Sequence, residues 1–157
     1  VPPIAEVEPV PYGTWEVLRR GQGLAILAVG TMVLPALEAA EKLAAEGVEA
    51  TVVNCRFLKP YDREVFEDVV RSHRAVLTLE EGTLVNGFGS FMAREIDSFM
   101  GERQVQVQAV GLPDHFVEHG PRRELLAELG LDADGIHAVA LGLARQSGLR
   151  KTARESA

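Results

Sequence analysis

Two histidines and a glutamate stand close together late in the chain, in the sequence His115-Phe-Val-Glu118-His119. This spacing matches the inverted zinc-protease pattern, in which two imidazoles one helical turn apart hold zinc and the glutamate polarises the bound water. Such a site needs a stable helix, but Pro113 precedes the motif and Gly120-Pro121 follows it at once. We therefore reject a metal site at His115, Glu118 and His119, and we expect a loop there.

A second candidate is the glycine-rich stretch from Gly82 to Ser90, which contains Asn86, Gly87 and Gly89 and leads into a helical pattern. Bare backbone amides at the start of a helix can hold a phosphate group. The stretch, however, matches neither the dinucleotide-binding pattern nor the P-loop. The alternative is that the glycines let the chain turn and bring the helix close to the sheet or to a partner.

Polar residues also follow two predicted buried strands: Gly30-Thr31 comes after one and Glu80-Glu81 after the other. In a parallel sheet ordered 2-1-3-4 these ends flank the switch point, where ligands of open α/β sheets bind. Alternatively, one carboxylate caps a helix or pairs with an arginine while the other is solvated. The sequence thus predicts a candidate ligand or partner crevice with the following residues: Gly30, Thr31, Glu80, Glu81, Asn86, Gly87 and Gly89.

Other catalytic groups are sparse. The single cysteine, Cys55, excludes an internal disulfide and a cysteine-cluster zinc site, and we interpret it as a buried thiol at a strand end. No serine lies in a G-x-S-x-G elbow. The residues alone therefore indicate one plausible crevice and no complete catalytic set.

The composition sets limits on the class of protein. A chain of 157 residues corresponds to about one domain, and its net charge of −7 argues against nucleic-acid or anionic-membrane partners. No apolar run approaches the roughly 20 residues of a membrane helix, and no signal pattern opens the chain, so we expect a cytoplasmic protein.

The elements that must position these residues alternate between strands and helices. Strands are expected at 15–19, 24–29, 50–54, 75–79 and 105–110, and helices at 34–46, after Asp62, from Phe88 to Phe99, at 121–129 and from Asp132 to Gln146. Thr31 is expected to cap the first helix. This alternation predicts an α/β fold: a three-layer α/β/α sandwich with an about five-stranded, mostly parallel sheet. The strand at 15–19 is expected to run antiparallel to its neighbour across the tight turn at 20–23, and the strand at 105–110 to lie at an edge.

The ends of the chain differ in character from the middle. We divide the chain into a proline-rich linker at 1–14, an α/β domain at 15–147 and a frayed basic tail at 148–157. Because the chain does not begin with methionine, we expect it to be a piece of a longer protein.

Several segments in a fixed order carry a resemblance to a known family. They are Leu24-Ala-Ile-Leu-Ala-Val-Gly-Thr31, Arg56-Phe-Leu-Lys-Pro-Tyr-Asp62, Leu79-Glu-Glu-Gly82, Asn86-Gly-Phe-Gly-Ser90, Gly111-Leu-Pro-Asp114 with His119-Gly120, and Glu128-Leu-Gly-Leu-Asp132 with Gly135-Ile136. Together they resemble the C-terminal domain of 1-deoxy-D-xylulose-5-phosphate synthases, thiamine diphosphate enzymes of the transketolase superfamily. The first strand and the Arg-Phe-Leu-Lys-Pro turn are shared more loosely with transketolases and 2-oxo acid dehydrogenase β subunits.

The resemblance implies a parent enzyme that condenses pyruvate with glyceraldehyde 3-phosphate and releases carbon dioxide, in isoprenoid and thiamine biosynthesis. It implies that the diphosphate and Mg²⁺ of the thiamine cofactor bind in a first domain, around a Gly-Asp-Gly motif, and that the catalytic glutamate lies in a second. Gly-Asp-Gly does not occur in this chain. The third domain would pack against the second and help form a homodimer. No catalytic, cofactor-binding or metal-binding residue is carried over, and the chain alone is expected to be inactive. The alternatives are the equivalent domain of a transketolase or 2-oxo acid dehydrogenase β subunit, and a free-standing ligand-binding regulatory module.

Overall fold

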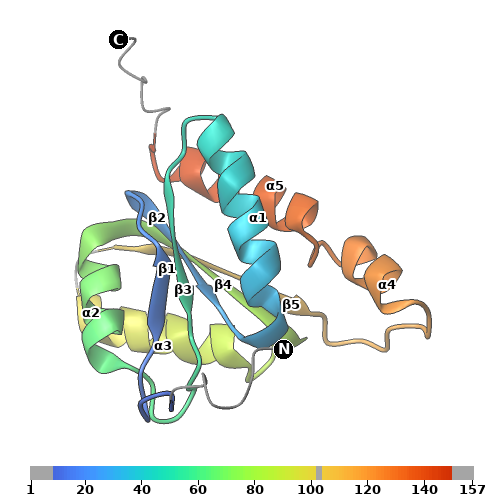
Figure 1. Ribbon diagram of the computed structural model, residues 1–157, viewed down its shortest axis with the longest axis horizontal. Helices are drawn as coiled ribbons and strands as arrows, with labels where there is room; N and C mark the ends of the chain where they lie inside the picture. Colours follow the sequence, from blue (N-terminus) through green and yellow to red (C-terminus); the bar gives the residue numbers. More distant parts are fainter. Residues whose placement is uncertain (1–8, 102–103, 150–157) are drawn as a thin grey trace.

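The computed structural model describes residues 9–101 and 104–149 and contains one five-stranded sheet (Figure 1). The strands are β1 (Glu16–Arg19), β2 (Gly23–Ala28), β3 (Ala50–Asn54), β4 (His73–Thr83) and β5 (Gln106–Leu112). The helices are the 3-10 turn η2 (Gly30–Met32), α1 (Val33–Ala45), α2 (Arg63–Ser72), α3 (Phe88–Met100), α4 (Arg122–Glu128) and α5 (Ala133–Gln146). The α/β alternation predicted from the sequence is confirmed.

The strands lie in the order β1-β3-β2-β4-β5, and all pairs are parallel except β1 with β3. The four parallel strands thus follow the predicted 2-1-3-4 order, with β5 at an edge. The prediction for Glu16–Arg19 is corrected in one respect: its antiparallel partner is β3, not β2, with Glu16 opposite Asn54. Because β2 already has β3 and β4 on its two sides, β1 can join the sheet only at its outer edge.

Helices cover both faces of the sheet and complete the three layers. Helices α1 and α5 pack on one face, in a core cluster with Leu24, Ile26 and Leu77. Helices α2 and α3 pack on the other, in a cluster with Leu27 and Val76. Figure 1 shows the two pairs of helices on opposite sides of the strands. Residues 24–28 of β2 are fully buried, as expected of a strand that is covered on both faces.

Aspartates begin two of the helices, as predicted. The Asp62 carboxylate accepts a hydrogen bond from the Val65 amide, and the Asp132 carboxylate accepts one from the Gly135 amide. The second oxygen of Asp62 accepts the Trp15 amide at 2.9 Å, which joins the start of α2 to the segment before β1. The expectation for Thr31 is wrong, because no side chain caps α1 and Thr31 lies in the preceding 3-10 turn.

Residues near both ends of the described chain contact the domain. Tyr12 packs edge-on against Phe57, and the Thr14 hydroxyl donates to the Pro11 carbonyl. At the other end the Leu149 amide donates to the Ala144 carbonyl, and the Leu149 side chain packs against the α1–α5 core cluster. Most of the predicted linker and tail, residues 1–8 and 150–157, lies outside the described residues.

Candidate functional site

Glu80 lies in the sheet and holds the start of α3. Strand β4 continues to Thr83, beyond the predicted end at Leu79, and its extension pairs Thr83 with Leu112 of β5. The Glu80 side chain is 7% exposed, and its two oxygens accept the amides of Phe88 at 2.9 Å and Gly89 at 2.8 Å. A carboxylate satisfies two free N–H groups there and lies at the positive end of the helix dipole. Glu80 therefore acts as the cap of α3.

Glycine is required at the start of α3, because the chain there passes close to the sheet. A β-carbon on Gly87 would lie 2.1 Å from the Thr83 carbonyl oxygen, and one on Gly89 would lie 2.6 Å from the Ala109 β-carbon. Asn86 takes the left-handed conformation at φ 59°. The backbone amides of Phe88 and Gly89, which could have received a phosphate, thus face the Glu80 carboxylate. The close contacts of the glycines agree with the alternative considered for this stretch, in which they bring the helix close to the sheet.

Glu81 faces the opposite side of β4 from Glu80, because it contacts Thr31 and Arg122 whereas Glu80 contacts the start of α3. Its carboxylate accepts hydrogen bonds from the Arg122 guanidinium at 2.8 and 2.6 Å and from the Thr31 hydroxyl at 2.5 Å. These contacts, Arg122 first, lower the pKa of Glu81 from 4.5 to about 2. The Thr31–Glu81–Arg122 network therefore joins the turn after β2, the end of β4 and the start of α4.

The structure brings the predicted crevice residues together in two separate groups. Thr31 meets Glu81 on one side of β4, whereas Glu80 meets Gly87 and the Gly89 amide on the other. The two carboxylates do not form a proton-sharing pair, and each already has hydrogen-bond donors from the chain itself. Gly30, at φ 57°, has open space around it. A ligand role for this crevice stays a prediction.

The histidines of the zinc pattern lie in an exposed loop. His115, Glu118 and His119 follow β5 in a segment without helix, so the one-turn spacing needed for two imidazoles on zinc does not arise. Across residues 9–101 and 104–149 no group of three His, Cys, Asp or Glu side chains is placed to hold a metal ion. Phe116, between the histidines, is 90% exposed.

Cys55 is buried, as the sequence predicted. Its side chain is 1% exposed at the end of β3, and burial raises the pKa of the thiol well above its ordinary value. A thiol that stays protonated in an apolar site is a poor nucleophile. The cysteine therefore belongs to the core of the α2–α3 face.

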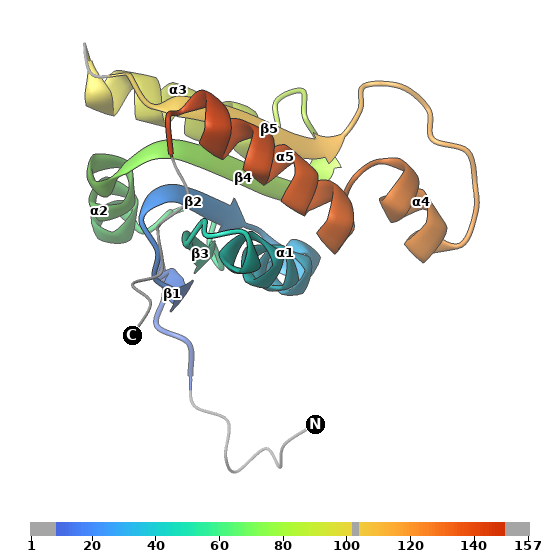
Figure 2. The same cartoon turned by 90° about the horizontal axis from the view of Figure 1, so that it is seen from above.

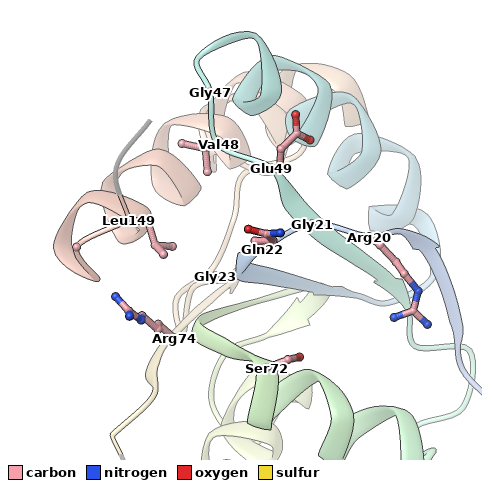
Figure 3. A pocket seen from close by; sticks show the side chains of 11 residues that line it. Arg20, Gly21, Gln22, Gly23, Gly47, Val48, Glu49, Ser72, Arg74 and Leu149 are labelled. Carbon is pink, nitrogen blue, oxygen red and sulfur yellow. The ribbon is translucent and has the colours of Figure 1, made fainter. Parts of the chain in front are cut away.

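A hollow of about 830 Å³ lies at the amino ends of the parallel strands, lined by Arg20, Ser72 and Arg74 among others (Figure 3). In Figure 3 Arg20 and Arg74 stand on opposite sides of it and do not converge on one point. Leu149 borders it, and a β-carbon on Gly23 would lie 2.3 Å from the Leu149 side chain. The arrangement has no pair of charged groups aimed at a common ligand atom.

The sequence interpretation missed an apolar groove of about 750 Å³ beside the start of α3. Its lining combines the Arg56-Phe-Leu-Lys-Pro turn with the exposed side of α3, and consists of Leu58, Lys59, Pro60, Tyr61, Arg63, Asn86, Gly87, Phe88, Phe91 and Arg94. Leu58 at its rim is 45% exposed. Phe91 and Arg94 are three residues apart and so lie on the same face of the predicted helix, and this spacing could have indicated the surface.

Comparison with known proteins places this architecture in a family. Residues 13–136 match the family described as "Transketolase, C-terminal domain". Relatives named 1-deoxy-D-xylulose-5-phosphate synthase include one from Geobacter sulfurreducens, 46% identical over 88% of this chain and 22% of its own length. Another, from Pelotomaculum thermopropionicum, is 49% identical over 81% of this chain and 20% of its own length. The chain thus spans about a fifth of the curated relatives it matches.

A solved structure entitled "Split gene transketolase, inactive beta4 tetramer" superposes with a TM-score of 0.77. It is 38% identical, and the match covers 87% of this chain and 44% of that one. The sheet order, the single antiparallel strand and the helices on both faces fit this relationship. On the family match and these likenesses, the chain belongs to the transketolase C-terminal domain family.

Proposed function

We propose that this chain is the C-terminal domain of a 1-deoxy-D-xylulose-5-phosphate synthase and has a structural role there. The parent enzyme would condense pyruvate with glyceraldehyde 3-phosphate in the cytoplasm, and this domain would pack against its thiamine-binding domains and support a homodimer. The observation that carries the proposal is the sequence identity of 46–49% to such synthases. The match covers most of this chain and about a fifth of the length of each synthase.

The described side chains support a structural role. The Glu80 carboxylate accepts hydrogen bonds from amides at the start of α3, the Glu81 carboxylate pairs with Arg122, and Cys55 is buried. The acidic residues in the described ranges do not gather into a set that fits Mg²⁺, which prefers carboxylate oxygens and substrate phosphates. Because the described residues offer no such set, we assign the thiamine diphosphate–Mg²⁺ site to the preceding domains of the proposed parent enzyme.

The experiment compares the 157-residue chain with the full-length polypeptide from the same genome. We expect isothermal titration of the chain with thiamine diphosphate and Mg²⁺ to show no micromolar binding, and we expect no release of carbon dioxide from pyruvate. The full-length polypeptide should show both binding and product formation. Micromolar binding to the short chain would refute the structural role, and a full-length protein without synthase activity would refute the parent enzyme.

A transketolase parent is the second candidate, favoured by the 38% identity to the split-gene transketolase. It predicts ketol transfer between sugar phosphates in place of pyruvate consumption, and the same full-length preparation tests both reactions. We give less weight to a free-standing ligand-binding module, because Thr31, Glu80 and Glu81 are already engaged within the chain.

A further inference from the structure

Asparagine followed directly by glycine can react with itself, and this sequence occurs once in the chain, at Asn86-Gly87. The glycine amide loses its proton to solvent, and its nitrogen attacks the Cγ carbon of the asparagine side chain. The new C–N bond closes a cyclic succinimide, while the side-chain nitrogen takes up a proton and leaves as ammonia. Water then opens the ring at either carbonyl and gives aspartate or isoaspartate. Glycine favours the attack because it has no side chain to obstruct it.

The structure leaves both reacting groups at this position free. Asn86 is exposed, and its side-chain amide forms no hydrogen bond with any described residue. The Gly87 amide likewise donates to no group within residues 9–101 and 104–149. In Figure 2 the yellow-green loop between β4 and α3 projects from the body of the domain. The attacking nitrogen and the carbon that it attacks are therefore both available.

The backbone at Asn86 can also leave its present conformation at low cost. It is the one non-glycine residue of the described chain with a positive φ, 59°, which few residues with a side chain adopt. Asn86 and Gly87 lie in a turn between β4 and α3, so rotation there breaks no pairing of the sheet. Rotation toward the geometry of the ring relieves strain instead of creating it.

Two comparable positions lack this freedom, because the attacking amide is already bonded. The amide that follows Asn54 donates to the Ala28 carbonyl at 2.9 Å. The amide that follows Asp134, in the single Asp-Gly sequence of the chain, donates to the Asp132 carboxylate at 2.8 Å. A bonded amide must be released by local opening before it can react. The fold therefore distinguishes Asn86-Gly87 from both.

The charges around Asn86-Gly87 favour loss of the amide proton. Lys59, Arg63 and Arg94 line the groove beside α3 together with these two residues, and the described lining includes no acidic residue. Cations nearby stabilise a group that becomes negative. The Glu80 carboxylate is also close to Gly87, but its two oxygens already accept amides at the start of α3.

The chain has no room for a longer backbone at Gly87. A β-carbon there would lie 2.1 Å from the Thr83 carbonyl oxygen and 2.5 Å from a Glu80 oxygen. Isoaspartate adds an extra carbon to the main chain just before this point and a negative charge near Glu80. The start of α3 would have to move, and the Phe88 and Gly89 amides would move with it away from the carboxylate that caps them.

From these observations we infer that Asn86-Gly87 is a site of spontaneous covalent modification, and that its isoaspartate product releases the Glu80 cap of α3. The chain would lose stability with age through this one reaction, at a place selected by the fold as well as by the sequence. The inference concerns the chain itself and does not depend on the parent enzyme.

The first test ages the 157-residue chain at mildly alkaline pH, folded and in urea. Aspartate and isoaspartate at positions 54, 86 and 134 are quantified by mass spectrometry with electron-transfer fragmentation. The unfolded sample gives the intrinsic rate of each sequence, so the ratio of folded to unfolded rate isolates the effect of the fold. We expect this ratio to be at least about tenfold higher at Asn86 than at Asn54 or Asp134, because its attacking amide needs no release.

An equal or lower ratio at Asn86 would overturn the inference. So would a product that is aspartate alone, because hydrolysis that bypasses the ring gives no isoaspartate.

The second test concerns the cap and uses separated forms of the chain. The isoaspartate form carries an additional negative charge, so ion exchange separates it from the unmodified chain. It should unfold at a lower urea concentration than freshly purified N86D, which has the same charge but a backbone of normal length. N86G keeps the left-handed conformation without the reactive side chain, so ageing should not change its unfolding. An isoaspartate form that unfolds together with N86D, or a loss with age that N86G shares, would overturn the release of the cap.

Discussion

Glu80 allows a direct test of how α3 is held on the sheet. Its oxygens accept two separate amides, from Phe88 and Gly89, in a site where the side chain is 7% exposed. Glu80→Gln keeps the size of the side chain but replaces one acceptor oxygen with an NH₂ group. That group is a donor only, so it faces a backbone N–H without forming a hydrogen bond.

The cost of this substitution follows from the two interactions that are lost. One buried donor without a partner costs about 1–3 kcal/mol, and the removal of a negative charge from a helix N-terminus costs about 0.5–1 kcal/mol. The sum is about 2–4 kcal/mol, a large part of the roughly 5–15 kcal/mol typical of a domain. For a domain of this size it corresponds to a decrease in Tm of about 6–12 °C.

Urea unfolding of the 157-residue chain at pH 7 measures this loss. Trp15 is the single tryptophan, is 5% exposed, and its ring centroid lies 6.5 Å from that of Phe88, so its fluorescence reports on the region around α3. Glu81→Gln is the matched control, because it removes a surface pair that contributes about 1 kcal/mol or less. An E80Q protein that unfolds at the same urea concentration as the wild type, or no earlier than E81Q, would refute the capping role.

Three further predictions concern the same sheet and its helices. Gly89→Ala should destabilise the chain by about 1–3 kcal/mol, because a β-carbon there forces α3 away from the sheet. Gly142→Ala in α5 has open space around it and should be neutral or stabilising by up to about 1 kcal/mol. Thermal denaturation compares the two variants. The pKa of Glu81 is lowered to about 2 in the folded state. The difference in unfolding free energy between wild type and E81Q should therefore be complete above pH 4.5 and vanish as the pH falls toward 2. A difference that stays constant with pH would contradict the ion pair with Arg122. Burial lowers the pKa of His73 below 6.5, so on acidification this histidine is protonated in the unfolded chain before it is protonated in the folded one. The free energy of unfolding should therefore decline as the pH falls below 6.5. In urea titrations H73Q should lack that part of the decline.

The helices and strands could be predicted from the sequence where they depend on residues close together in the chain. The aspartate caps at Asp62 and Asp132, the continuous apolar strand at Leu24 and the order of the parallel strands follow from capping, burial and crossover geometry. The partner of β1 was predicted incorrectly, because the turn at 20–23 suggests a neighbour along the chain, whereas the free edge of the sheet lies beside β3.

The candidate site was predictable only in part. The sequence brought Thr31, Glu80 and Glu81 to one end of the sheet, and it offered both a ligand and a capping interpretation. The choice between them depends on β4 continuing past Leu79, because this extension sends the two carboxylates to opposite faces. That extension is formed by pairing with β5, about thirty residues further along the chain, and no local pattern around Glu80 reports it.

The two hydrogen bonds of Asp62 also have a mechanical consequence. One oxygen holds the Trp15 amide and the other holds the Val65 amide, while the Trp15 indole N–H donates to the Phe57 carbonyl at 2.8 Å. A pull applied to the chain on the N-terminal side of Trp15 reaches this residue before it reaches β1, which is four residues long. Asp62 passes that load to α2, so the domain resists it through a helix packed in the core as well as through an edge strand.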